Sequence, residues 1–291
     1  MPSAPVSAWI EAARPKTLPA SLAPVLLGAA HAWAIVGHLN VARTLLALFV
    51  ALALQVGVNY ANDYSDGIRG TDDVGKRVGP QRLTGPGLAA PGAVLAAALA
   101  SFALAALAGL ALIAVCKAWY FLLIGALAIV AAWYYTGGKH PYGYIGGVAD
   151  LLVFCFFGLV ATMGTIYTQV DHANVAAWSS AAGIGLLSCA LLMVNNLRDL
   201  PGDRDSGKKT LAVRLGDNRA RWVYYAYVCF GCLLAIPTSV VAAAILALAG
   251  FVIVRPVGRG ASGLELIRVL KHTGLLTLAY GVVVGAAAII G

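Results

Sequence analysis

Long apolar runs separated by short polar stretches dominate the chain. Runs of bilayer-spanning length occupy nine ranges, at residues 18–38, 42–62, 91–115, 118–136, 144–168, 174–195, 221–237, 239–255 and 272–290. A membrane-spanning helix needs about 20 consecutive apolar residues. Helices of a soluble protein would carry polar stripes along one face, and these runs carry almost none. The pattern therefore predicts an all-α, polytopic membrane protein with nine transmembrane helices.

The composition supports the membrane class and a single unit. Apolar residues make up 60% of the chain and charged residues 11%, with a mean hydropathy of +0.84. These values are typical of polytopic membrane proteins. The two longest polar stretches, 63–90 and 196–220, are interpreted as loops rather than soluble domains. We therefore expect one membrane domain over residues 1–291.

The basic residues are distributed very unevenly between the two expected sides. With nine helices, 18 of the 20 Lys and Arg residues fall on the side of the N-terminus, and only Arg43 and Lys117 fall on the other. Lys and Arg are enriched in cytoplasmic loops. We expect a cytoplasmic N-terminus and cytoplasmic active-site loops, in a bacterial inner membrane. The net charge of +8 suits anionic headgroups and a phosphorylated substrate better than nucleic acid, since no nucleic-acid-binding module accompanies it.

Acidic residues gather in two short stretches. Seven of the 12 acids of the chain lie within residues 63–73 and 199–205. Carboxylates are costly beside hydrocarbon, so their clustering indicates that a cation is held there. Mg²⁺ takes oxygen ligands and often binds together with a phosphate. The candidate metal ligands are Asp63, Asp66, Asp72, Asp199 and Asp203.

The two stretches share a spacing. Asn59 precedes Asp63 by four residues, and Asn195 precedes Asp199 by four. Side chains at this spacing lie on the same face of a helix. Asp203 extends the second face only if the helix continues through a proline–glycine step. Solvated loop ends are the alternative, but they would not need this repeated spacing.

Each acidic stretch is followed by a basic, glycine-rich one. These lie at residues 75–82 and 206–210, and a third polar stretch at 134–142 falls on the same side. Aspartates beside Arg and Lys suggest a bound metal–diphosphate pair, because guanidinium and ammonium groups bind the remaining phosphate oxygens. We expect the three loops to cap one cavity.

The ordered motifs resemble a known family. Asn62-Asp63-x-x-Asp66 and Asp199-x-x-x-Asp203, four helices apart, resemble the UbiA-type aromatic prenyltransferase superfamily over essentially the whole chain. Three further strings are similar to 1,4-dihydroxy-2-naphthoate prenyltransferases of menaquinone synthesis: Arg77-x-Gly79-Pro80-x-Arg82, Tyr135-Thr136-Gly137-Gly138 and Asn195-Asn196-Leu197-Arg198-Asp199.

The chain departs from the family pattern at two positions. Gly70 stands where the superfamily has a further aspartate, and Asp72 is offered instead. The first ligand set therefore ends at either Asp66 or Asp72. Asp150 stands where a glutamate is expected, which leaves the chemistry on the acceptor side open.

The resemblance implies a Mg²⁺-dependent enzyme. It would transfer a polyprenyl group from polyprenyl diphosphate to 1,4-dihydroxy-2-naphthoate, release CO₂ and diphosphate, and give demethylmenaquinol. The implied catalytic residues are Asp63, Asp66, Asp199, Asp203 and Lys139. The implied substrate-binding residues are Asn59, Asn62, Arg77, Arg82, Tyr135, Asn195, Asn196, Lys208 and Asp150.

Several alternatives stay open on the residues alone. Lys139 and Tyr135 would also suit an interfacial anchor pair. Another aromatic acceptor, such as 4-hydroxybenzoate, homogentisate or a porphyrin-type ring, would use the same motifs. A secondary transporter would place its polar site near the bilayer midplane, whereas these carboxylates lie at one membrane face. No residue pattern in the sequence indicates the prenyl chain length or the oligomeric state.

Overall fold

The described part of the protein is helical. A computed structural model describes residues 4–70 and 82–291, and within these ranges the only β-type pairing is one bridge between Ile145 and Lys209. The helices are α1 (Val6–Ala12), η1 (Pro15–Thr17), α2 (Leu18–Val36), α3 (Val41–Ile68), α4 (Pro91–Cys116), α5 (Phe121–Tyr134), η2 (Tyr142–Tyr144), α6 (Val148–Val153), η3 (Phe154–Val160), α7 (Ala161–Gln169), α8 (Val175–Asp205), α9 (Leu211–Leu215), α10 (Asp217–Leu233), α11 (Val240–Gly258) and α12 (Leu264–Ile290).

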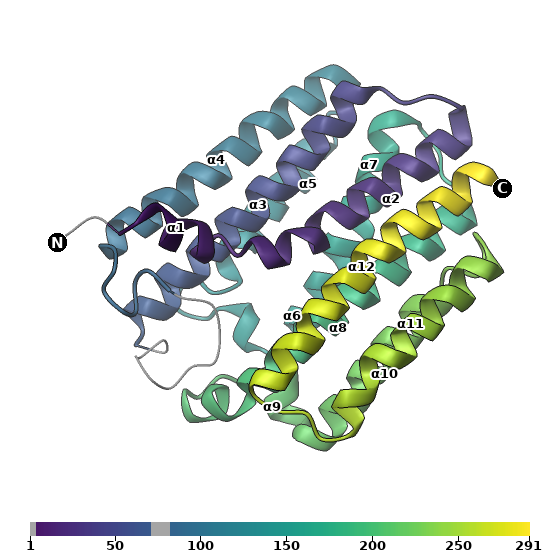
Figure 1. The fold of residues 1–291 in the computed structure, drawn as a ribbon. Coiled ribbons are helices and arrows are strands. Elements are labelled where there is room, and N and C mark those ends of the chain that lie inside the picture. The colour runs from purple at the N-terminus through teal and green to yellow at the C-terminus, as the bar shows by residue number, and fades with distance from the viewer. Residues whose placement is uncertain (1–3, 71–81) are drawn as a thin grey trace.

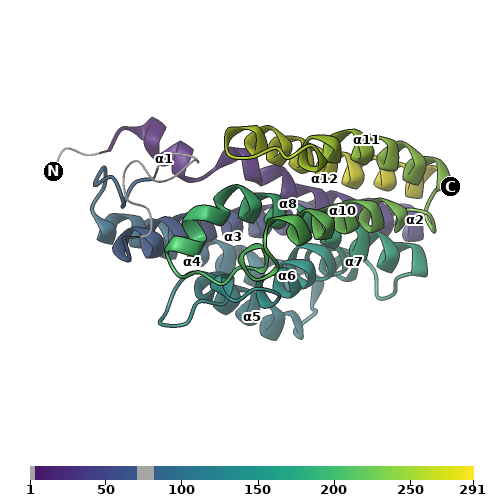
Figure 2. The same ribbon diagram turned by 90° about the horizontal axis from the view of Figure 1, so that it is seen from below.

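The long helices lie side by side along one axis, as Figure 1 shows. The C-terminal end of α3 and the short helix α9 lie at one end of this bundle, and the C-terminus of the chain lies at the other. Seen from below in Figure 2, α11 and α12 form one side of the bundle and α5 lies on the opposite side. All-helical architecture is therefore confirmed.

Seven helical segments of the described residues are long and apolar enough to cross a membrane. A helix also covers part of each of the other two predicted ranges. Of these, α5 is apolar but has 14 residues, and α10 has 17 residues and includes Arg219 and Arg221. The seven candidate spans make this an integral membrane protein, and the count of nine stays a prediction.

Both motif-bearing helices are longer than predicted. Helix α3 continues to Ile68 and α8 continues to Asp205, through Pro201 and Gly202. The predicted loop starts at residues 63 and 196 were therefore wrong. Hydropathy marks where a helix leaves the apolar layer, whereas packing against other elements decides where it ends. As a result, Asp66 and Asp203 both project from helices.

The predicted helix at 144–168 is irregular. It consists of α6, the π-helical segment η3 and α7. Gly158 of η3 lies against Gly185 of α8 so closely that a Cβ atom on Gly158 would fall 2.6 Å from the Gly185 Cα atom. Small residues allow two helix backbones to approach in this way. π-Helical turns are rare and are often found at functional sites.

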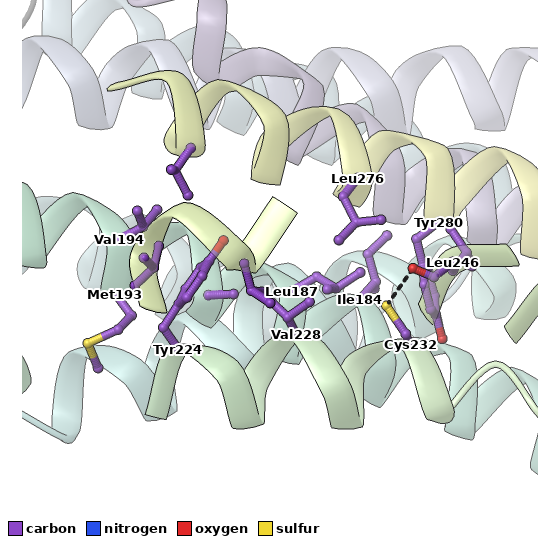
Figure 3. Close-up of a cluster of buried hydrophobic side chains, with 14 of the residues drawn as sticks. Ile184, Leu187, Met193, Val194, Tyr224, Val228, Cys232, Leu246, Leu276 and Tyr280 are labelled. Carbon is purple, nitrogen blue, oxygen red and sulfur yellow. Dashed lines mark hydrogen bonds between the residues drawn. The ribbon is translucent and has the colours of Figure 1, made fainter. Parts of the chain in front are cut away.

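The main apolar core lies between α8, α10, α11 and α12, with two residues of α2. Figure 3 shows its centre, where Leu187 of α8, Val228 of α10 and Leu276 of α12 face one another. The hydroxyl of buried Tyr224 is 2.8 Å from the hydroxyl of Thr273, so the ring is held at its polar end as well. This half of the bundle is solidly packed.

The outer surface is strongly apolar. Large side chains such as Leu107, Leu123, Leu248 and Phe251 are more than half exposed. Exposed apolar surface on this scale marks contact with a membrane or a partner. In the first turn of α3, Arg43 donates to the backbone oxygens of Val115 and Thr168 and so joins the C-terminal ends of α4 and α7.

Candidate active site

A long cavity of about 620 Å³ lies in the other half of the bundle. Its walls come from α2, α3, α4, α5, η3, α7 and α8. Along α3 it extends from Ala47 to Asn62, a length of about 22 Å at the rise of an α-helix. Most of its lining is apolar, including Ile113, Phe156 and Phe157. The length and the mostly apolar lining of the cavity suit an extended apolar chain.

The arginine, asparagines and tyrosines of the lining gather at one end of the cavity. Asn59 and Asn62 of α3, Tyr135 and Asn195 line this end, together with Arg14, which precedes α2. Four of these residues were predicted as site residues, and the structure brings them to one place. Arg14 was not predicted, because its sequence position suggested only a flanking charge. Its backbone is left-handed, with a φ of 55°, a conformation that non-glycine residues seldom adopt.

The asparagines of α3 are held by the elements around the cavity. The Asn59 amide donates to the Ala13 backbone oxygen at 2.8 Å and accepts from Gln55 at 3.3 Å. The Asn62 side-chain oxygen accepts from the Thr136 hydroxyl at 2.6 Å. Both side chains are buried, and both tie α3 to a neighbouring segment. Their orientation at the cavity is thus fixed before any ligand binds.

Asp63 is fully buried and is bound by backbone amides. One carboxylate oxygen accepts from the Leu83 N–H at 2.8 Å, and the other accepts from the Thr84 N–H at 2.9 Å. The sequence predicted Asp63 as a metal ligand. In the structure its two oxygens hold the loop that follows the first basic stretch against the end of α3.

Asp66 is where the cationic side chains converge. Its Oδ1 atom accepts from the Tyr144 hydroxyl at 2.5 Å and lies 3.5 Å from the Lys208 Nζ atom. Its Oδ2 atom pairs with the Arg82 guanidinium at 3.2 Å. The side chains of Asp66 and Arg82 are only 7% and 5% exposed, so this ion pair is poorly screened by solvent.

The second acidic motif meets the first through Lys208. The Lys208 Nζ atom lies 3.7 Å from Asp203 Oδ1 as well as 3.5 Å from Asp66 Oδ1. The two aspartates come from α8 and α3, so one ammonium group joins the two motifs. The predicted convergence of these two motifs is therefore seen in the geometry of the described residues.

Asp199 has a different partner. The neighbouring Arg198 guanidinium binds both of its oxygens, at 2.7 and 2.6 Å, and also donates to Asn195 at 2.8 Å. The Arg198 side chain is 3% exposed and that of Asp199 17%. Arg198 belongs to the motif at residues 195–199 but was not predicted as a site residue. It places positive charge beside the polar end of the cavity.

Backbone contacts fix the third polar loop. Arg69, one residue past the end of α3, donates to the backbone oxygens of Thr136 and Gly138, both at 2.5 Å. Gly146 donates to the Lys209 oxygen at 2.7 Å, and Lys209 donates to the Tyr144 oxygen at 3.0 Å. These contacts join the third loop to α3, and they join the loop at 206–210 to the segment that follows the third loop. Of the first predicted loop, only Arg82 belongs to the described residues.

Tyr144 is the main residue that the sequence reasoning missed. Its hydroxyl donates to Asp66, and the ammonium of Lys208 lies 4.7 Å from the centre of its ring. Burial raises the pKa of the Tyr144 phenol, and the negative charge of Asp66 raises it further. The hydroxyl therefore stays protonated and remains a donor. The only signal in the sequence was its position just after the third polar stretch.

Several predicted residues lie away from this cluster. Lys139 is exposed, and the described residues offer it no ion pair. Asn196 and Asp150 are buried but do not line the cavity. Asp150 instead accepts a hydrogen bond of 3.3 Å from Tyr227. Asp72 and Arg77 lie outside the described residues.

The carboxylates of the site suit a Mg²⁺ ion that takes its other ligands from the substrate and water. Among residues 4–70 and 82–291, no three His, Cys, Asp or Glu side chains form a metal-binding group. Mg²⁺ usually takes one or two carboxylates and fills its shell with substrate phosphates and water. Asp66 and Asp203, whose oxygens approach the same ammonium group, offer such a pair.

Comparison with known proteins agrees with this arrangement. Residues 21–269 match the model of the UbiA prenyltransferase family. A 1,4-dihydroxy-2-naphthoate octaprenyltransferase from Mycobacterium tuberculosis is 49% identical, with 97% of each chain covered. The enzyme of the same name from Escherichia coli is 42% identical over 78% of this chain and 74% of its own.

The fold has solved counterparts. The structure of a UbiA homolog from Archaeoglobus fulgidus bound to DMAPP and Mg²⁺ superposes with a TM-score of 0.71. It is 14% identical and covers 97% of this chain and 99% of its own. The same protein bound to GPP and Mg²⁺ gives a TM-score of 0.72. At this identity the likeness concerns the fold.

The contacts of Asp63 generate a first prediction. In an Asp63→Asn variant the amide can accept from one backbone N–H but turns a donor toward the other. We expect a loss of about 2 kcal/mol from the unsatisfied amide and the lost charge. Hydrogen exchange of the Leu83 and Thr84 amides should become faster. The control is Asp205→Asn, an exposed carboxylate at the end of α8. Unchanged protection in Asp63→Asn would contradict the assigned contacts.

Proposed function

The chain belongs to the UbiA prenyltransferase family, and from that premise we propose that it transfers a polyprenyl group from polyprenyl diphosphate to 1,4-dihydroxy-2-naphthoate. CO₂ and diphosphate leave, and demethylmenaquinol is the product. The observation that carries the proposal is a long, mostly apolar cavity, one end of which carries Arg14 and three asparagines and lies beside two convergent aspartate motifs. The choice of 1,4-dihydroxy-2-naphthoate as acceptor rests on the two relatives named 1,4-dihydroxy-2-naphthoate octaprenyltransferase, which are 49% and 42% identical to this chain.

The diphosphate is proposed to bind at the end of α3. Arg82, Lys208 and Arg198 provide three cations around the aspartates of the two motifs. Arg binds phosphate oxygens with two donors, and Lys binds them as a point charge. Arg77 and Lys139, at the neighbouring loops, remain candidates for the outer phosphate. When bound, Mg²⁺ would neutralise the diphosphate and make it a better leaving group.

Asp66 and Asp203 are proposed as the carboxylates that bind Mg²⁺. Their Oδ1 atoms lie 3.5 and 3.7 Å from the same Lys208 Nζ atom and so approach a common point. Asp63 is instead held by backbone amides and Asp199 by Arg198. We propose Asp63 and Asp199 as flanking residues that shape the site. Asp72 remains a further candidate ligand.

The cavity is proposed to direct the chemistry. Cleavage of the allylic C–O bond leaves the bonding electrons on the diphosphate and a cation on the prenyl group. The apolar walls keep water from that cation. The ring carbon that carries the carboxylate attacks it, and a C–C bond forms. When the carboxylate leaves as CO₂, the electrons of its bond return to the ring, so charge and atoms balance.

The acceptor is proposed to lie at the polar end of the cavity. Arg14 lines this end, and its planar guanidinium matches a carboxylate group. Tyr135 and Asn195 line the same end and offer hydrogen bonds to ring hydroxyls. In this position the acceptor would lie between the diphosphate and the apolar part of the cavity, where the prenyl tail extends.

The membrane arrangement is part of the same proposal. A single domain with nine transmembrane helices would place the polar end of the cavity on the cytoplasmic side of a bacterial inner membrane. Arg14, Arg69 and Lys208 lie at the polar end of the cavity, whereas Arg43 lies at the opposite end. This distribution of charge agrees with the expected orientation. A polyprenyl tail gains about 0.8 kcal/mol per buried CH₂, which favours an enzyme inside the bilayer.

An acceptor panel tests the proposed function. Membranes containing the protein would be incubated with a radiolabelled polyprenyl diphosphate and with 1,4-dihydroxy-2-naphthoate, 4-hydroxybenzoate or homogentisate. We expect a labelled product with the naphthoate only, and release of CO₂ from a carboxyl-labelled acceptor. EDTA should stop the reaction, and Mg²⁺ should restore it. Transfer to another acceptor, or activity that resists the chelator, would contradict the proposal.

Substitution of the two convergent aspartates tests the metal assignment. We expect Asp66→Asn and Asp203→Asn each to lower kcat at least about a hundredfold, because the transition state loses charge stabilisation. Asp217→Asn serves as the control, since Asp217 pairs with Arg221 on α10 and does not line the cavity. Near-normal turnover of either variant at saturating Mg²⁺ would show that it is not a metal ligand.

A further inference from the structure

Lys208 lies where the proposed metal would bind. Its Nζ atom is 3.5 Å from Asp66 Oδ1 and 3.7 Å from Asp203 Oδ1, the same oxygen atoms that the two motifs offer to a cation. The ammonium also lies over the ring of Tyr144, at 4.7 Å from its centre. The side chains of the three charged residues are 7–14% exposed. The ammonium group therefore lies between the two carboxylates that are proposed above to bind the metal.

The backbone around Lys208 is fixed, whereas its side chain is long. The Lys208 N–H donates to the Asp203 backbone oxygen at 2.9 Å, and the next residue, Lys209, is held by Tyr144 and Gly146. The preceding Gly207 has a φ of 74°, which closes the turn after α8. The four-carbon stem of lysine can turn about several bonds. The ammonium can thus leave the aspartates without any movement of the backbone.

The charges of this cluster favour exchange over simple addition. The guanidinium of Arg82 and the ammonium of Lys208 already pair with the carboxylates of Asp66 and Asp203, so positive charge lies at this place before a metal arrives. A divalent cation that enters beside the ammonium meets like charge at short range in a poorly solvated place. A diphosphate offers the displaced ammonium new oxygen partners within reach.

We propose that Lys208 occupies the metal position in the substrate-free enzyme and moves to the diphosphate when the metal arrives, so that metal and prenyl diphosphate bind cooperatively. Lys208 is then a positioning residue that keeps the two motifs together between turnovers. It also disfavours binding of the metal alone. The inference rests on the proposed function and adds an order of binding to it.

Metal binding without diphosphate tests the inference. The full-length protein in nanodiscs would be titrated with Mn²⁺ alone, and free Mn²⁺ would be measured by its electron paramagnetic resonance signal. We expect Lys208→Met to bind Mn²⁺ about tenfold more tightly than the wild type, a size typical of coupling between sites. Lys208→Arg, which keeps the charge, should bind it weakly, as the wild type does. Lys209→Met changes the exposed neighbouring lysine and should have no effect.

A second titration separates this role from ordinary phosphate binding. At saturating Mg²⁺, Lys208→Met should bind geranyl diphosphate about tenfold more weakly, so the two affinities change in opposite directions. A purely structural lysine would weaken both. A lysine that only binds phosphate would leave Mn²⁺ affinity unchanged. Either of these results would overturn the inference.

Two controls keep the test decisive. Circular dichroism and thermal unfolding would establish that Lys208→Met is folded, and Lys208→Gln would replace it if it is not. Failure of the proposed function would appear as absence of prenyl transfer by the wild type in the acceptor panel. Failure of the inference would appear as unchanged or weakened Mn²⁺ affinity in Lys208→Met while the wild type is active.

Discussion

The burial of charge at the C-terminal end of α3 is the constraint on which the site depends. Buried carboxylates need charged or hydrogen-bonding partners. Asp63 finds them in the backbone of the loop at 83–84, and Asp66 finds them in Tyr144, Arg82 and Lys208. Because these partners come from three different loops, satisfying two aspartates also determines how the loops are arranged over the cavity.

The two halves of the bundle differ in packing: one is filled with apolar side chains and the other surrounds the cavity. The packed half, centred on α8, α10, α11 and α12, contains most of the buried apolar side chains. The other half surrounds the cavity and has only small apolar clusters. Helix α8 belongs to both, since Leu187 packs in the core while Asn195 lines the cavity and Asp203 joins the charged cluster.

Much of this arrangement could be predicted from the sequence. Apolar runs located the long helices, because the bilayer requires length and apolarity that few other structures share. The four-residue spacing placed Asn59 and Asp63 on one face of α3. Partners that depend on tertiary contacts could not be predicted. Nothing in the local sequence shows that Asp63 would bind backbone amides, or that Tyr144 would meet Asp66. Helix ends were misplaced for the same reason, since packing carries α3 and α8 beyond their apolar parts.

The position of the metal relative to Asp66, Asp203 and Lys208 is the most direct test of this account. It would be measured in crystals of the protein grown with Mn²⁺ and a non-hydrolysable thio analogue of geranyl diphosphate, from the anomalous scattering of manganese. We expect a manganese peak within coordination distance of Asp66 and Asp203, with the Lys208 ammonium turned to the diphosphate. A peak that Asp63 binds in place of Asp66, or a Lys208 that still bridges the two aspartates beside bound metal, would contradict it.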